Sequence, residues 1–171
     1  MVIRPATLLD IPQILDLQRI CYEIAFQEDS AAFSTKINQP YSLCWVVEKE
    51  GELLAYFMAM ATNREQFPCL NTEQYDVLGH TDILYLHDMA ISPQARGQGL
   101  LKQLLAKVWQ QAEQLMLKEA FLIAVQGSSN MWASKGFIAV EAKQYGLEAQ
   151  LRTYGEGAVL MYKKIGNSVL K

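Results

Sequence analysis

The residues most able to do chemistry lie in the glycine-containing segment 94–100, which reads Gln-Ala-Arg-Gly-Gln-Gly-Leu. An apolar segment that predicts a strand precedes it, and a long amphipathic segment that predicts a helix follows it. Glycine lets a ligand approach the backbone closely. The first amide groups of a helix have no partner inside the helix and point along the positive end of its dipole. These properties suit the segment to hold a pyrophosphate group.

The spacing of the glycines excludes two familiar phosphate-binding loops. The nucleoside triphosphate loop, Gly-x-x-x-x-Gly-Lys-Ser/Thr, does not occur in the sequence. A dinucleotide fingerprint, Gly-x-Gly-x-x-Gly, would need glycine where Lys102 stands. It would also begin at the end of the strand, whereas Ser92-Pro93 intervenes here. A third kind of phosphate loop therefore has to be considered.

The spacing Gln94-x-x-Gly97-x-Gly99 resembles the Gln/Arg-x-x-Gly-x-Gly/Ala signature of the GNAT superfamily of acyl-CoA N-acyltransferases. The strand segment 86–93 stands directly before it, as in that family. Segment 131–137, Met-Trp-Ala-Ser-Lys-Gly-Phe, looks like the family's Phe-Tyr-x-x-x-Gly-Phe segment. The resemblance extends over roughly residues 2–164.

The resemblance implies an α/β fold with a central mixed β-sheet of about six or seven strands and about four helices. It also implies a single N-acetyltransferase domain spanning residues 1–171. Apolar runs and turn residues predict strands at 2–6, 43–47, 53–61, 83–91, 120–126, 137–140 and 158–163. Apolar spacing and caps predict helices at 10–25, 30–37 and 97–118, with a turn or short helix through 135.

Two features of this layout bear on the site. A helix between the apolar strands 83–91 and 120–126 implies a right-handed crossover with those strands parallel. The segment 63–82 lacks a sustained period, and a loop of this length inside a compact domain is often functional. We expect this loop to cover the site and to contact the substrate.

In the GNAT family the motif strand splays from the next parallel strand, and its backbone pairs with the pantetheine arm of acetyl-CoA, the cosubstrate. The resemblance places Met89, Ala90 and Ile91 there, with the Met89 amide polarising the thioester carbonyl. It also implies that Gln126 pairs with pantetheine amides and that Trp132 packs against the arm, with a plain core role for Trp132 as the alternative. The pyrophosphate would be held by the motif and first helical turn: Gln94, Ala95, Arg96, Gly97, Gln98, Gly99, Leu100 and Lys102.

His87 is the candidate general base. It lies two residues before Met89, so a regular strand would place both side chains on one face. Arylalkylamine N-acetyltransferases, which the chain resembles here, carry histidine at this position, where a neutral imidazole could accept a proton from the substrate ammonium. The alternative is a hydrogen-bonded histidine within the sheet, since those enzymes have a second histidine where this chain has Tyr85. Asp88 would face the other way in a structural role, unless a bulge reverses it.

The general acid is not fixed by the sequence. Trp132 stands where many family members have the tyrosine that protonates the departing thiolate, and indole cannot do this. A thiolate with a pKa near 8.5 could leave without an acid. Otherwise the acid would be one of four hydroxyl groups: Ser128, Ser129, Tyr154 or Tyr162. Among the acidic residues, Glu23 and Glu48 could bind the amine.

Composition narrows the class of partner. Residues 1–90 hold 5 basic and 13 acidic side chains, whereas residues 91–171 hold 10 basic and 5 acidic ones. The overall net charge of −3 argues against nucleic-acid binding. The longest apolar run, 53–61, is too short to cross a bilayer, so we expect a cytoplasmic protein without a membrane partner. Three widely spaced cysteines indicate neither disulfides nor a metal site: Cys21 and Cys44 are expected in the core and Cys69 in a loop.

The expected activity is direct transfer of the acetyl group of acetyl-CoA to a primary amine, without an acyl-enzyme. The acidic first half favours a cationic small molecule, such as a polyamine, amino sugar or amino-acid derivative. Two alternatives are a protein acetyltransferase acting on a lysine or N-terminal amine, and a non-catalytic acyl-CoA binding domain. Family members are often dimers, which leaves a homodimer open.

Overall fold

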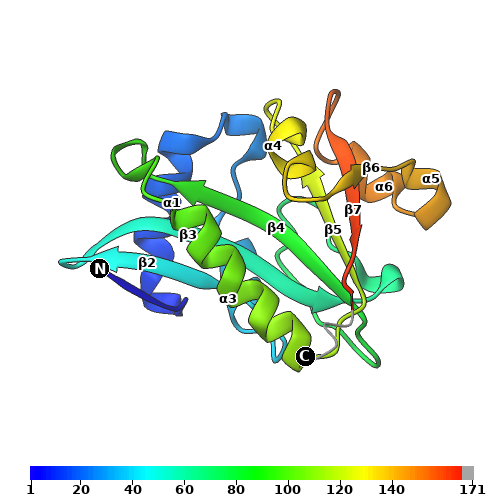
Figure 1. The fold of residues 1–171 in the computed structure, drawn as a ribbon, viewed down its shortest axis with the longest axis horizontal. Helices are drawn as coiled ribbons and strands as arrows, with labels where there is room; N and C mark the ends of the chain where they lie inside the picture. The colour runs from blue at the N-terminus through cyan, green and yellow to red at the C-terminus, as the bar shows by residue number, and fades with distance from the viewer. Residues whose placement is uncertain (167–171) are drawn as a thin grey trace.

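The computed structural model describes residues 1–166. In these residues seven strands form one mixed sheet in the order β1-β2-β3-β4-β5-β7-β6 (Figure 1). Each lies within two residues of its expected bounds. The strands are β1 (Val2–Pro5), β2 (Trp45–Lys49), β3 (Glu52–Thr62), β4 (Ile83–Ile91), β5 (Glu119–Ala124), β6 (Ile138–Ala139) and β7 (Val159–Lys164). The expected mixed α/β fold is confirmed.

Residues 1–166 contain six α-helices, two more than expected. They are α1 (Ile11–Cys21), α2 (Ser30–Ile37), α3 (Leu100–Gln114), α4 (Ser129–Ala133), α5 (Ala142–Tyr145) and α6 (Glu148–Arg152), with 3₁₀ turns η1 (Leu8–Asp10), η2 (Ile24–Phe26), η3 (Arg64–Gln66) and η4 (Pro93–Ala95). The unexpected pair, α5 and α6, span four and five residues, too few to show a helical period in the sequence. No helix in this part of the chain has the length and apolar character needed to cross a bilayer.

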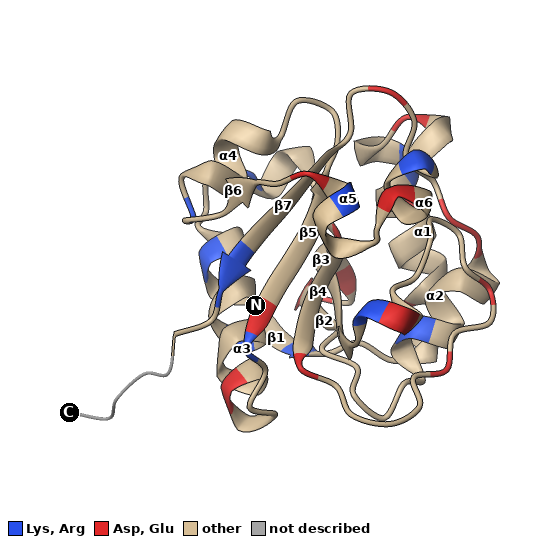
Figure 2. Cartoon of the chain, turned by 90° about the vertical axis from the view of Figure 1, so that its right-hand side faces the viewer, with Lys and Arg blue, Asp and Glu red and all other residues tan. Residues whose placement is uncertain are grey.

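The sheet is covered on both faces (Figure 1). The α3 helix packs on one face through an apolar stripe that includes the buried Leu104, Val108 and Ala112. The α1 and α2 helices lie on the other face through residues such as Ile14 and Phe33. Burying each large apolar side chain stabilises the fold by about 1.5–3 kcal/mol. The acidic residues gather on the α1, α2 and α6 side, in accord with the acidic first half (Figure 2).

The first helix ends earlier than expected, and this shapes the site. It stops at Cys21 because Tyr22 takes an extended backbone conformation, with φ −123° and ψ 142°. The chain then turns back through η2 and is tied to α1 at Gln18. Gln18 Nε2 donates to the Glu28 carbonyl, and the Glu28 amide donates to Gln18 Oε1, each over 2.8 Å. The segment between α1 and α2 is thereby held as a defined structure.

Strands β4 and β5 run parallel and then diverge. Their pairing runs from Ile83 opposite Glu119 to Leu86 opposite Leu122. Beyond this point β4 keeps its antiparallel pairing with β3, and β5 keeps its pairing with β7. The facing edges of the two strands therefore separate toward the carboxyl end of β4. The expected parallel pair joined by α3 is confirmed.

Candidate active site

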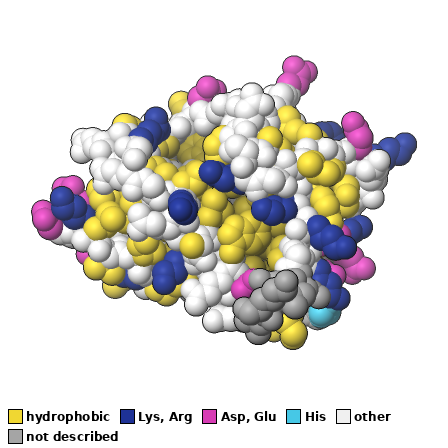
Figure 3. Space-filling model, in the orientation of Figure 1, with side chains coloured by type: hydrophobic (Ala, Val, Ile, Leu, Met, Phe, Trp, Pro, Cys, Tyr) yellow, Lys and Arg dark blue, Asp and Glu magenta, His cyan; other side chains and the backbone are white. Residues whose placement is uncertain are grey.

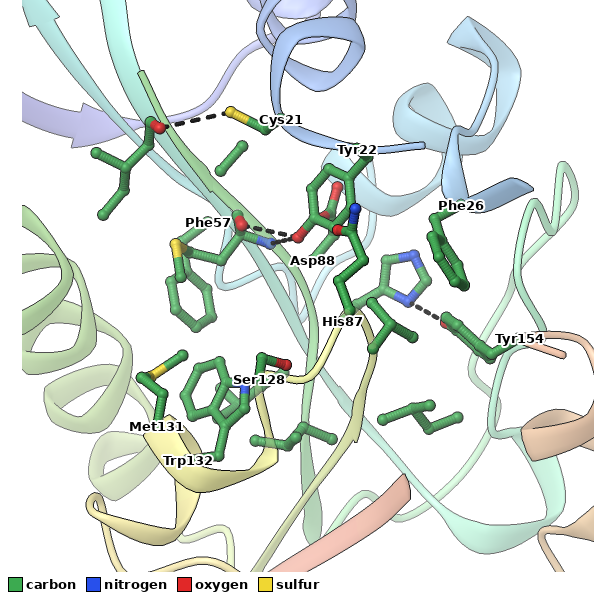
Figure 4. Close-up of a pocket in the computed structure, with 18 of the residues that line it drawn as sticks. Cys21, Tyr22, Phe26, Phe57, His87, Asp88, Ser128, Met131, Trp132 and Tyr154 are labelled. Carbon is green, nitrogen blue, oxygen red and sulfur yellow. Dashed lines mark hydrogen bonds between the residues drawn. The ribbon is translucent and has the colours of Figure 1, made fainter. Parts of the chain in front are cut away.

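A cavity of about 480 Å³ lies where β4 and β5 separate. Residues on the α3 side of the sheet, such as Phe57 and Trp132, line it together with residues on the α1 side, such as Tyr22 and Glu28. The cavity thus runs between the strands from one layer to the other (Figure 4). The face that carries α3 shows apolar hollows with basic side chains at their margins (Figure 3). Seven predicted site residues line the cavity: His87, Met89, Ala90, Ile91, Arg96, Gln126 and Trp132.

The other predicted residues belong to the loop before α3 and to its first turn. Gly97 and Gly99 have φ of +78° and +75°, which glycine adopts without strain, and a Cβ on either would meet no described atom within 4 Å. Ala95 and Leu100 are buried, so only their backbones are available. Gln94, Gln98 and Lys102 are exposed and lie outside the cavity lining.

The backbone at the start of α3 has the properties predicted for an anion site. Gly99 is the N-cap of the helix. The first amide with a helical partner belongs to Gln103, which donates to the Gly99 carbonyl over 3.2 Å. The preceding amides in the first turn point out of the helix end. The glycines leave open space beside this end of the helix. The geometry there suits a pyrophosphate, whose position stays a prediction.

Met89 presents its backbone to the cavity beside a tyrosine hydroxyl. Tyr22 donates to the Met89 carbonyl over 2.8 Å, and the Met89 amide reaches the same hydroxyl over 3.4 Å (Figure 4). The second distance is long for an N–H···O bond. The Met89 amide is therefore only weakly engaged. No sequence pattern marks Tyr22, because its position at the cavity depends on the early end of α1.

Trp132 and Gln126 line the cavity from the segment after β5. Trp132 is buried and packs edge to face on Phe57 and Phe137, with ring centroids 6.5 and 5.7 Å away. Trp132 therefore lines the cavity and is at the same time part of the hydrophobic core. Gln126 is exposed with φ +50°, an uncommon conformation for a residue other than glycine.

The expectation that His87 and Met89 share a face is wrong, because β4 is not regular. A bulge shifts its register against β3: Met58 pairs with Asp88, but the next residue, Ala59, pairs with Leu86. His87 is the extra residue in this bulge. Met89 packs toward the α3 layer with Leu86. His87 and Asp88 both turn toward the opposite layer, so the expected opposition of these two side chains is also wrong.

His87 lies at the centre of a buried chain of polar groups. Its Nε2 is 2.7 Å from Glu28 Oε2, and its Nδ1 is 3.3 Å from the Tyr154 hydroxyl. The Tyr154 hydroxyl is 2.9 Å from that of Tyr85. On the other side, Lys36 Nζ donates to Glu28 Oε1 over 2.9 Å. The side chains of Lys36, Glu28 and His87 are each at most 1% exposed.

The ionisation of Glu28 is set by its partners. Burial alone would raise the pKa of this carboxyl, but the charges and hydrogen bonds of His87 and Lys36 outweigh burial and lower the pKa to about 2. The Asn71 amide also donates to Glu28 Oε1, over 2.7 Å. Glu28 is thus an ionised, fully partnered carboxylate next to the cavity.

Asp88 is a second carboxylate at the cavity, with a different environment. Its Oδ2 accepts from the Tyr56 hydroxyl over 2.7 Å. Burial raises the pKa of Asp88, although His87 and the hydroxyls of Tyr56 and Tyr22 act in the opposite direction. The pKa of Asp88 is therefore higher than that of an exposed aspartate.

Some of the predicted acids and amine-binding carboxylates line the cavity, and others do not. Of the four hydroxyl groups considered as acids, Ser128 and Tyr154 line the cavity, while Ser129 and Tyr162 lie outside its described lining. Glu48 pairs with Arg4 over 2.7 Å, and the exposed Glu23 is also absent from the lining. The carboxylates that line the cavity are Asp88 and Glu28, and no local motif marks Glu28 in the sequence. The expectation that segment 63–82 reaches the site is met at Leu70, which lines the cavity.

The cysteines depart from expectation at one position. Cys44 is buried and Cys69 lies in the loop, as expected, whereas Cys21 is half-buried and lines the cavity. Its thiol is 3.4 Å from the Ile91 carbonyl, and burial raises its pKa. A thiol held protonated in this way is a poor nucleophile. Within residues 1–166 no group of three or more His, Cys, Asp or Glu residues could hold a metal ion.

The ion pairs of Glu28 predict a stability loss in acid. The pKa of Glu28 falls from about 4.3 in an unfolded chain to about 2 in the fold. Its stabilisation is therefore complete above pH ~4.3 and lost as the pH falls toward 2, a loss of about 3 kcal/mol. Urea unfolding at pH 5 and pH 2.5 measures about 2 kcal/mol of this loss. Glu28→Gln should flatten this pH dependence and Glu23→Gln, at an exposed glutamate, should not; equal slopes in all three proteins would contradict the assignment.

The chain has an open mixed sheet, a cavity between diverging parallel strands and a glycine-rich turn before the next helix. These features together are those of an acetyltransferase. The sequence matches the model of the acetyltransferase (GNAT) family over residues 11–137. The chain belongs to this family and is an acyltransferase. No curated protein sequence matches it significantly.

Three solved structures with this fold are 15–18% identical to the chain. Rv2747 from Mycobacterium tuberculosis, solved with CoA and NLQ, is 16% identical, with a TM-score of 0.70 and coverage of 97% of this chain and 100% of that one. N-acetylglutamate synthase from Neisseria gonorrhoeae, solved with coenzyme A and N-acetyl-glutamate, is 18% identical, with a TM-score of 0.75 and coverage of 97% and 35%. The ribosomal-protein-S18-alanine N-acetyltransferase from Escherichia coli is 15% identical, with a TM-score of 0.65 and coverage of 99% and 98%.

Proposed function

We propose that this chain, as one domain, transfers the acetyl group of acetyl-CoA directly to the primary amine of a small molecule. The observation that carries the proposal is the separation of β4 from β5 beyond Leu86 and Leu122, which opens a cavity along the backbone of β4. The Rv2747 and N-acetylglutamate synthase structures contain CoA. We also propose that the protein acts in the cytoplasm.

The residues present fit acetyl-CoA. Backbone groups of Met89 face the cavity, where an extended pantetheine arm can pair with them. Gly97 and Gly99 leave room for the pyrophosphate beside the first turn of α3, and the Arg96 guanidinium lies at the same end of the cavity. Arginine and helix amides are both suited to phosphate oxygens. Gln126 and Trp132 would contact the arm from the β5 side.

The opposite end of the cavity favours a small acceptor. Segment 63–82 contributes Leu70 to the lining there, and this segment is held in place on two sides. The Leu70 amide donates to Thr153 Oγ1 over 3.1 Å, while the Tyr75 hydroxyl donates to Thr62 Oγ1 over 2.7 Å. Together with the Asn71 bond to Glu28, these contacts hold the segment against the cavity, which favours a small acceptor over a peptide chain that needs an open groove.

The side chains at this end of the cavity indicate which class of acceptor it would bind. Lys36 and His87 both contact the Glu28 carboxylate, which leaves Asp88 as the carboxylate beside the cavity that is paired only with hydroxyl groups among the described residues. Phe26 and Leu70 add apolar walls. A single ammonium on a compact, partly apolar molecule fits this arrangement better than a polyamine with several charges.

Acetyl-CoA supplies an activated thioester for attack by the amine. Asp88 would hold the ammonium, and the histidine centred in the buried chain would receive its proton before attack. The Met89 amide would donate to the thioester carbonyl oxygen as negative charge develops there, in place of its long contact with Tyr22. Trp132 supplies no proton, and a thiolate with a pKa near 8.5 leaves without one.

The proposal predicts acetyl-CoA binding in the micromolar range and turnover with a small primary amine. Calorimetric titration measures the first, and thiol release in a panel of arylalkylamines, polyamines, amino sugars, amino acids and lysine peptides measures the second. Turnover confined to peptides would make the chain a protein acetyltransferase. Binding without any turnover would make it an acyl-CoA binding domain, and absence of binding would overturn the choice of donor. Trapping of an acetylated enzyme, tested against Cys21→Ser, would contradict direct transfer.

A further inference from the structure

A fully buried lysine behind the site has no place in the mechanism so far. Lys36 lies on α2 with no exposed side-chain surface, and its ammonium donates to Glu28 Oε1 and to the Ala32 carbonyl over 2.9 and 3.2 Å. A buried charge of this kind is costly unless it is well partnered. The Asn71 amide and the two Gln18 bonds hold its partner Glu28 in place. The fold therefore fixes a Lys–Glu pair directly behind His87.

The hydrogen bonds determine which nitrogen of neutral His87 carries the proton. An ionised carboxylate can only accept, so the 2.7 Å contact with Glu28 requires a hydrogen on Nε2. Nδ1 then accepts from the Tyr154 hydroxyl. The Tyr154 oxygen can accept from Tyr85 as well, and it keeps a second lone pair. Since both ring nitrogens are occupied and the side chain is only 1% exposed, His87 does not meet the amine directly.

We propose that the substrate ammonium meets Tyr154, and that Tyr154 and His87 form a proton relay positioned by Glu28 and Lys36. The proton leaves the ammonium nitrogen for the Tyr154 oxygen while the Tyr154 hydroxyl proton moves to His87 Nδ1. The products of this step are a neutral amine, a neutral tyrosine and an imidazolium paired with Glu28. No net charge is created, because the positive charge passes from the substrate to His87. The relay rests on the proposed acetyl transfer and assigns Tyr154 as a catalytic residue.

Lys36 and Glu28 are positioning residues that act through His87. Glu28 favours the imidazolium, whereas the Lys36 ammonium, on the far oxygen of the same carboxylate, opposes it. The two charges therefore act on the imidazole in opposite directions, and His87 Nδ1 is the ring atom that can accept a proton through Tyr154. The other titratable groups around the ring are Asp88 on β4, Tyr85 on β4 and Tyr154 after α6, while Tyr22 and Tyr56 are hydroxyl groups facing Asp88.

The chain has two histidines, so His80→Gln leaves His87 as the sole imidazole. NMR of ¹⁵N-histidine-labelled protein in this background should show the Nε2–H tautomer. Adding Lys36→Met should raise the His87 titration midpoint, and adding Glu28→Gln should lower it, each by about one pH unit. Lys36→Arg, which keeps the charge, should restore the starting midpoint. Tyr154→Phe should leave the midpoint near its starting value and lower kcat by about 100-fold.

A merely structural role for the Lys–Glu pair would move both midpoints the same way or not at all, and either result would overturn the relay. An Nδ1–H tautomer would also overturn it, and this measurement holds even where Lys36→Met does not fold. Full activity in Tyr154→Phe would remove Tyr154 from the relay. The NMR measurements need no substrate, so failure to acetylate any amine would count against the proposed function and not against the histidine electrostatics.

Discussion

Replacement of His87 by glutamine is expected to lower kcat for acetyl transfer at pH 7 by about 10²–10⁴-fold. Glutamine can keep a hydrogen bond to Glu28, but it cannot accept the proton that the substrate ammonium must lose before attack. The loss should be smaller at alkaline pH, where more of the amine is already deprotonated. Initial rates measured from pH 6 to pH 10 with saturating acetyl-CoA test both parts of this expectation.

The matched control is His80→Gln, which changes the exposed histidine in segment 63–82 and should keep the wild-type rate and profile. Far-ultraviolet circular dichroism and urea unfolding separate a lost base from a lost fold. A His87→Gln enzyme with an unchanged pH profile would show that His87 is only a hydrogen-bonded residue of the sheet, the alternative that the sequence left open.

Gly99→Glu is expected to weaken acetyl-CoA binding by at least about 100-fold. The substitution places a carboxylate and its side chain in the open space beside the first turn of α3, where the pyrophosphate would lie. Like charges there repel, and the ligand loses its room. Calorimetric titration of acetyl-CoA into the variant and the wild type measures the change directly.

This variant also strains the backbone, because Gly99 has φ +75°. Gly79→Glu is the matched control, since Gly79 has φ +84°, equally open surroundings and a position outside the cavity lining. It should share the strain and keep the affinity. Equal loss in both variants would show that backbone strain explains the effect, and unchanged affinity in Gly99→Glu would place the pyrophosphate elsewhere.

The sequence was most informative where structure is local. Hydrophobic periodicity located every strand of the described chain to within two residues, and the glycine spacing located the turn before α3. Hydrophobic periodicity does not predict the helices α5 and α6, because each is too short to show a helical period. Helix α1 is shorter than its apolar spacing predicts, because that spacing continues past Cys21 whereas the backbone turns at Tyr22.

The site was less predictable, because its geometry depends on contacts distant in sequence. Glu28 lies 59 residues from His87, and Tyr154 lies 67 residues from it. No spacing rule connects such residues. Alternation along β4 gave the wrong face for His87 because a bulge depends on pairing with β3, which a single strand does not encode. The residue types of the donor site were predictable, while the polar chain around the base required the structure.

The bulge at His87 has a consequence for how new chemistry can be added to an old scaffold. A regular strand must send adjacent side chains to opposite layers. One extra residue in β4 instead gives a basic and an acidic side chain to the same layer, while Leu86 and Met89 still pack toward α3. The bulge thus brings two neighbouring polar side chains to one layer while Leu86 and Met89 stay on the other side of the strand.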